Sequence, residues 1–132
     1  MTRSSLAALL ALSTTFVQPA AASSSVPYHS DGFYMDFSRD CTAVATPKPG
    51  RKLQVTLVRI DIGPYYSNQA GIVLYRDAKC LHAVAAHTPQ MTGLTVVPFN
   101  PALDLPVDGP LMARIWKPSV GLVFVDGYEI AP

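Results

Sequence analysis

LQVTLVRIDI, residues 53–62, is the stretch of sequence that decides the fold class. Apolar residues alternate with polar ones from Leu53 to Leu57, which is the pattern of a β-strand with one buried face. After Leu57 the apolar phase flips, and Val58 and Ile60 continue the alternation on the opposite face. A flip of this kind predicts either a β-bulge or a strand that is buried on each face in turn.

Shorter segments of the same kind lie on both sides of this run. The chain has 12 prolines and 8 glycines, which punctuate it at short intervals, and no window after residue 22 shows a helical apolar period. We therefore expect further strands at residues 33–37, 41–46, 72–76, 80–86, 94–99, 111–116, 122–125 and 128–130. Residues 100–110 are expected to be irregular.

So many short strands joined by turns predict an all-β fold, an antiparallel two-sheet β-sandwich, as a single domain over residues 23–132. Immunoglobulin domains place a tryptophan between their two cysteines. In this chain Trp116 follows both Cys41 and Cys80, so a jelly-roll sandwich is favoured over an immunoglobulin-like one.

The first 22 residues have the composition of a cleaved signal peptide. A short polar start with Arg3 precedes the apolar run at residues 6–12, and small residues follow up to Ala22. The apolar run is too short to span a membrane, which needs about 20 apolar residues. We expect cleavage after Ala22, no membrane span in the mature chain, and a secreted or periplasmic protein.

The net charge of the mature domain argues against a nucleic-acid partner. Removing Arg3 from the 10 basic residues leaves as many basic as acidic residues, of which there are 9. A neutral domain lacks the basic face that nucleic-acid binding requires.

In an oxidising compartment, Cys41 and Cys80 are predicted to form one internal disulfide bond.

Catalytic signals are weak. The chain has no G-x-S-x-G motif, and both cysteines are expected to be bonded. His82 and His87 would point to opposite faces of a regular strand, and His29 lies in the leader region, so we assign no catalytic residue and no metal ligand. A small hydrolase with an aspartate-based site is the third alternative, because any two carboxylates could meet in space. Asp36 and Asp61 fall within predicted strands, and Glu129 is the sole glutamate. The other aspartates are predicted at turns: Asp31, Asp40, Asp77, Asp104, Asp108 and Asp126.

Calcium is the one cofactor that the sequence leaves open, because loop aspartates in β-sandwich proteins often hold this ion. The candidate ligands are Asp104, Asp108 and Asp126, although no spacing matches an EF-hand loop.

Aromatic residues in a polar loop give the candidate ligand-binding site. Two adjacent tyrosines are followed by hydroxyl and amide side chains, a combination that suits sugars, whose C–H faces stack on rings. A tryptophan at a strand end could lie on the same rim. The predicted ligand-binding residues are Tyr65, Tyr66, Ser67, Asn68, Gln69 and Trp116.

The closing run at residues 121–130 resembles the last strand of carbohydrate-binding jelly-roll modules, which often end in an apolar strand with an Asp-Tyr pair. This chain departs from that pattern by placing Gly127 between Asp126 and Tyr128. The resemblance covers these residues alone, so it identifies no family and supplies no site residues.

The favoured hypothesis is a binding module without catalysis that recognises a glycan or a cell-surface component. The alternative is a protein-interaction module, such as an inhibitor, toxin subunit, effector or envelope structural subunit. It would act through an apolar patch or through an edge strand at residues 94–97 or 122–125.

Overall fold

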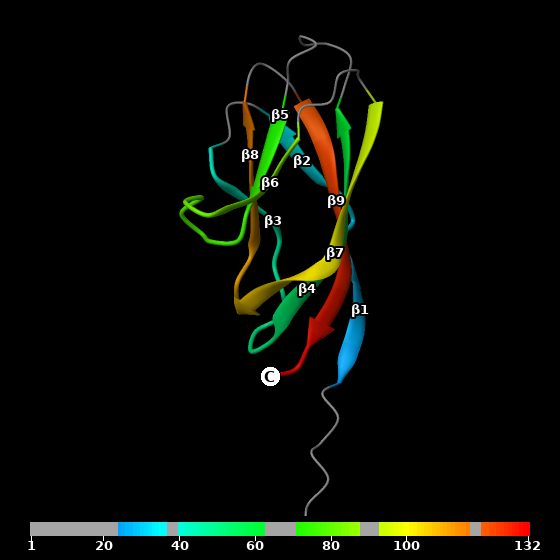
Figure 1. Ribbon diagram of the computed structural model, residues 1–132, viewed down its shortest axis with the longest axis vertical. Helices are drawn as coiled ribbons and strands as arrows, with labels where there is room; N and C mark the ends of the chain where they lie inside the picture. The colour runs from blue at the N-terminus through cyan, green and yellow to red at the C-terminus, as the bar shows by residue number, and fades with distance from the viewer. Residues whose placement is uncertain (1–23, 37–39, 63–70, 88–92, 117–119) are drawn as a thin grey trace, which may run out of the picture.

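The computed structural model describes residues 24–36, 40–62, 71–87, 93–116 and 120–132, and every regular element among them is a β-strand (Figure 1). The predicted signal peptide and the loop at residues 63–70 lie outside the described residues. The strands are β1 (Ser25–His29), β2 (Phe33–Asp36), β3 (Thr42–Ala45), β4 (Lys52–Ile62), β5 (Gly71–Tyr75), β6 (Ala83–His87), β7 (Gly93–Val107), β8 (Leu111–Trp116) and β9 (Val120–Ile130).

Two antiparallel sheets form the two layers that Figure 1 shows. The five-stranded sheet has the order β1-β9-β4-β7, with β2 also paired to β9, and the four-stranded sheet has the order β3-β8-β5-β6. The pairs are nested along the chain: β2 with β9, β3 with β8, β4 with β7, and β5 with β6. This nesting is the jelly-roll arrangement, so the predicted fold class is confirmed.

The hydrophobic core fills the space between the sheets. From the five-stranded sheet it takes Val58, Ile60, Val123 and Val125, all with 0% exposure. Ile72 and the other apolar residues of the four-stranded sheet complete the same cluster. Burial of each such side chain contributes about 1.5–3 kcal/mol, and this apolar cluster is the main term that holds the layers together.

The phase flip in β4 is a β-bulge at Thr56. The register shifts between Val55 and Leu57 against both neighbouring strands. As a result, Val55 and Val58 both face the core although three positions separate them, while Leu57 lies on the outer face. The hydroxyl of Thr56 donates to the carbonyl of Asp126 at 3.2 Å, which gives the extra residue a fixed partner.

The disulfide between Cys41 and Cys80 is present, as predicted, with the two Cα atoms 5.8 Å apart. It links the residue before β3 to the loop between β5 and β6, so it joins two separate parts of the four-stranded sheet. Among the described residues, no helix has the length and apolarity to cross a membrane.

Several of the predicted strand limits were wrong, and residues 122–125 and 128–130 belong to the one strand β9. Residues 25–29 are β1 rather than a leader, because they pair with the last residues of β9. Residues 100–107 continue β7 rather than forming an irregular segment, since that part of β7 pairs with the first half of β4. In the segment 80–86, the strand begins only at Ala83.

Candidate binding face

The outer face of the five-stranded sheet, turned away from the core, carries the most prominent surface feature. Along β9, Val123 and Val125 are buried in the core, so the alternating residues Leu122 and Phe124 point outward. The strand register then fixes which outward side chains are neighbours across the sheet.

Two adjacent rows of outward side chains follow from that register. The first row runs from Tyr34 on β2 through Leu122 on β9 and Asp61 on β4 to Leu94 on β7. The second row runs from Phe124 on β9 through Arg59 on β4 to Val96 on β7. We call these side chains the outer patch: Tyr34, Arg59, Asp61, Leu94, Val96, Leu122 and Phe124.

The apolar members of the outer patch are unusually open to solvent. Leu94 is 63% exposed, Tyr34 52%, Val96 49% and Leu122 39%. Single exposed apolar residues are ordinary, but several on one face of a protein make that face a candidate interaction surface. By the register, Asp61 and Arg59 of β4 lie between Leu122 and Phe124 on β9 and Leu94 and Val96 on β7. The group therefore consists of two apolar strips on either side of a charged pair.

Phe124 is held in place from two sides. Gly32 has a φ of +92°, and a Cβ there would lie 2.7 Å from Cε1 of the Phe124 ring, so only glycine lets the chain pass this close. On the neighbouring strand, Cζ of Arg59 lies 5.1 Å from the ring centroid, a cation–π arrangement. Both contacts restrict the position of the Phe124 ring.

A polar chain of three side chains runs along the border of the outer patch. Nε of Arg59 lies 3.2 Å from Oδ2 of Asp126, and the other carboxylate oxygen of Asp126 is paired with Nδ1 of His29. The Asp126 side chain is 27% exposed and that of Arg59 34%. Asp126 thus orients Arg59, and the guanidinium stays over the Phe124 ring.

The predicted ligand-binding loop, with Tyr65, Tyr66, Ser67, Asn68 and Gln69, lies outside the described residues. The backbone of Trp116 ends β8, where its register partner is Gly71, the residue that directly follows the segment 63–70. The side chain of Trp116 is also outside the described part of the chain.

The candidate calcium ligands are each engaged by protein donors. Nε2 of Gln54 donates to Asp104 at 3.0 Å, and the backbone N–H of Gly50 donates to Asp108 at 2.6 Å. Within the described ranges, no group of three His, Cys, Asp or Glu side chains could hold a metal ion.

Asp126 was predicted at a turn, and this prediction was wrong. It lies inside β9, which continues through Gly127. A Cβ at Gly127 would lie 2.0 Å from the carbonyl oxygen of Gln54, so this glycine serves the close approach of β4 and β9 rather than a turn. Among the histidines, His29 belongs to β1, and His82 lies in the loop before β6 rather than within the strand.

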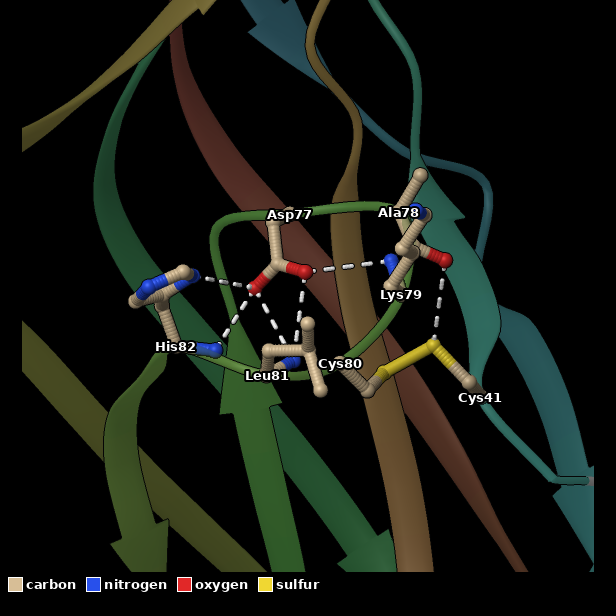
Figure 2. Close-up of polar contacts among 7 residues, drawn as sticks. All are labelled: Cys41, Asp77, Ala78, Lys79, Cys80, Leu81 and His82. Carbon is tan, nitrogen blue, oxygen red and sulfur yellow. Dashed lines mark hydrogen bonds and ion pairs between the residues drawn. A yellow bond between two sulfur atoms is a disulfide. The ribbon is translucent and has the colours of Figure 1, made fainter.

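The loop after β5 is tightly organised around the carboxylate of Asp77 (Figure 2). It accepts backbone N–H groups from Lys79 at 3.1 Å, Leu81 at 3.1 Å and His82 at 2.7 Å. Cys80 has a φ of 52°, and its disulfide fixes the loop to Cys41. The turn role that the sequence assigned to Asp77 is confirmed, and the loop presents Leu81, 71% exposed, on a rigid support.

Electrostatics agree with that geometry. Desolvation is the largest single influence on the Asp77 carboxyl and raises its pKa. The hydrogen bonds from His82, Leu81 and Lys79, together with the charge of His82, outweigh it, so the pKa of Asp77 lies below its ordinary value.

No protein-family model matches this chain, and no curated protein is similar to it. The candidate face is therefore identified by geometry. The sequence held one signal of it: residues 122–125 are apolar at every position, so the strand that contains them must be apolar on its outer face as well. We interpreted this run as an edge strand, which was wrong, because β9 lies between β4 and the pair β1 and β2.

Proposed function

We propose that this protein is an exported binding module that recognises a protein partner through the outer patch, without catalysis. The partner surface is apolar where it meets the strips on β9 and β7, and it carries a basic side chain placed to meet Asp61 between them. The observation that carries the proposal is the exposure of Leu94, Tyr34, Val96 and Leu122 on one sheet face, on either side of Arg59 and Asp61.

The kinds of residue in the outer patch support a protein partner. Binding energy at protein interfaces is concentrated in aromatic and arginine side chains at the centre, with apolar neighbours that exclude water. Here Phe124 and Arg59 lie side by side. Val96 flanks Arg59 from the adjoining strand β7, and Leu122 lies two positions from Phe124 on β9. A glycan would instead need several hydroxyl or amide partners around an open ring, and the outer patch offers one hydroxyl, on Tyr34, and no amide side chain.

Rigidity supports the same proposal. The outer patch stands on paired strands, and Gly32, Arg59 and Asp126 fix the position of the Phe124 ring. A surface whose side chains are already ordered loses less entropy on binding. The signal-peptide composition of residues 1–22 supports export. The disulfide bond is compatible with an oxidising compartment.

Site-specific photo-crosslinking tests the proposal in the native cell envelope or medium. A photoreactive phenylalanine analogue replaces Leu122 in one variant and Tyr34 in another. The control variant carries it at Ala86, an exposed residue of β6 in the opposite sheet. We expect one protein adduct of defined mass from both outer-patch positions and none from the control position.

Purified partner and matched variants complete the test. Leu122→Ser and Asp61→Ala should weaken binding by about tenfold or more, as substitutions at interface centres do, with melting temperatures near that of the wild type. Equal crosslinking from the control position, or binding unchanged in both variants, would refute the proposal. Selective binding of the wild type and of both variants on a glycan array would instead support glycan recognition by the aromatic loop at residues 65–69.

A further inference from the structure

β7 is an edge strand of the five-stranded sheet. In the described part of the chain it has β4 as its neighbour on one side and none on the other, which confirms the predicted edge at residues 94–97. An edge strand presents a row of backbone N–H and C=O groups that can pair with a further strand.

Pro98 shows which backbone groups of β7 face the open edge. It pairs with Leu57 of β4 in the ladder, but proline has no N–H, so this pair is a non-hydrogen-bonded one. The register is unbroken from there to the start of β7. By alternation, Thr95 and Val97 exchange hydrogen bonds with β4, while Leu94 and Val96 direct their N–H and C=O groups to the open edge.

The two parts of this edge differ in how they are protected. Pro98, Pro101 and Pro106 interrupt the second part of β7, and prolines on an edge strand block further pairing. The first part, residues 93–97, holds no proline and no charged residue. Its outward side chains Leu94 and Val96 are 63% and 49% exposed, so this part carries neither the prolines nor the charged side chains that commonly protect an edge strand.

We propose that residues 93–97 of β7 pair antiparallel with the same residues of a second copy of this chain, so that the two five-stranded sheets become one continuous sheet. The two-fold axis passes beside Thr95. In this register, Leu94 of each copy lies opposite Val96 of the other, and each such pair exchanges both backbone hydrogen bonds. A register centred on Val96 would instead place Leu94 opposite Pro98, which has no N–H to donate.

Side-chain chemistry fits a second copy better than a charged partner strand. Leu94 and Val96 of both copies meet on the outer face, where they shield one another from water. Asp61 of one copy falls in the same row as Arg59 of the other, with both β7 strands between them, so the pairing brings no like charges together. This inference concerns the strand edge and does not depend on the proposed function of the outer patch.

Sedimentation velocity of the mature chain, with its disulfide intact, tests the proposal over a wide concentration range. We expect a mass that rises from one chain towards two as concentration increases. Val96→Pro removes an N–H that β4 does not use, so the monomer should fold normally and stay monomeric. Val96→Thr keeps that N–H and nearly the same shape, and should still dimerise.

Leu94→Lys provides a second test that carries no folding risk, because this side chain is largely exposed. A lysine on the edge should reduce dimerisation strongly. Hydrogen exchange should show the Leu94 and Val96 amides protected in the dimer and open in Leu94→Lys. A wild type that stays monomeric, or a Val96→Pro variant that dimerises as well as the wild type, would overturn the proposal.

Discussion

The guanidinium of Arg59 lies over the ring of Phe124, with Cζ 5.1 Å from the ring centroid. The same ring also lies against Gly32, where a Cβ would lie 2.7 Å from Cε1. These contacts join the residue before β2 with β4 and β9 on the face of the sheet that does not touch the core. An ordered aromatic side chain on a solvent-facing sheet is the physical basis of the outer patch.

A series of three glycine-to-alanine variants separates backbone strain from crowding. Gly50→Ala meets only strain, because its φ is +76° and nothing lies within 4 Å, and should cost about 1 kcal/mol. Gly32→Ala adds the movable Phe124 ring and should cost about 2 kcal/mol. Gly127→Ala meets the Gln54 backbone and should cost about 3 kcal/mol or more. Urea unfolding measures all three, and a different order would contradict this account of the close approach of β4 and β9.

Arg59→Met tests the polar border of the outer patch. It removes the contact with the Phe124 ring and the ion pair with Asp126, both of them partly solvent-exposed. We expect a loss of about 1 kcal/mol in the free energy of unfolding. Arg59→Lys, the control, keeps the charge but not the planar contact and should recover only part of that loss. Equal stability of all three proteins would show that the contact contributes nothing.

Inward and outward side chains of the five-stranded sheet should respond differently to truncation. Ile60 is fully buried, so Ile60→Ala should destabilise the protein by about 3 kcal/mol. Leu94 is 63% exposed on the outer face, so Leu94→Ala should change stability by less than about 0.5 kcal/mol. Thermal unfolding at low protein concentration measures both, and a large loss for Leu94→Ala would mean that its exposure is misassigned.

Reduction of the disulfide should lower stability substantially. The bond spans a sequence separation of 39 residues, for which the chain-entropy relation gives about 4 kcal/mol. The double variant Cys41→Ser/Cys80→Ser should show the same loss under oxidising conditions. Adding a reductant should destabilise the wild type and leave the double variant unchanged, and the opposite pattern would rule out a stabilising role for the bond.

The lowered pKa of Asp77 predicts an acid-dependent part of the stability. The folded-state pKa lies below the ordinary value of 3.8, so the stabilisation is complete above that value and is lost as the pH falls through the folded-state pKa. Asp77→Asn should be less stable than the wild type at neutral pH, and the difference should shrink at acid pH. Denaturant unfolding at several pH values measures this, and a difference that grows on acidification would contradict it.

Local patterns in the sequence predicted the all-β class, the two-sheet sandwich and the disulfide, and they gave a bulge in residues 53–62 as one of two alternatives. Side-chain alternation shows whether a segment is a strand and which of its faces are apolar, and two cysteines allow only one internal pairing. Because Trp116 follows both cysteines, the sequence favoured a jelly-roll over an immunoglobulin-like sandwich, and the strand order agrees with a jelly-roll.

Long-range pairing decided the rest, because alternation within one strand contains no information about its neighbours. The structure makes residues 122–125 part of a central strand, extends β7 through the segment expected to be irregular, and recruits residues 25–29 as β1 against the end of β9. The outer patch exists only after that pairing, since Tyr34, Arg59 and Leu94 are far apart in sequence and become neighbours through the register of the strands that carry them.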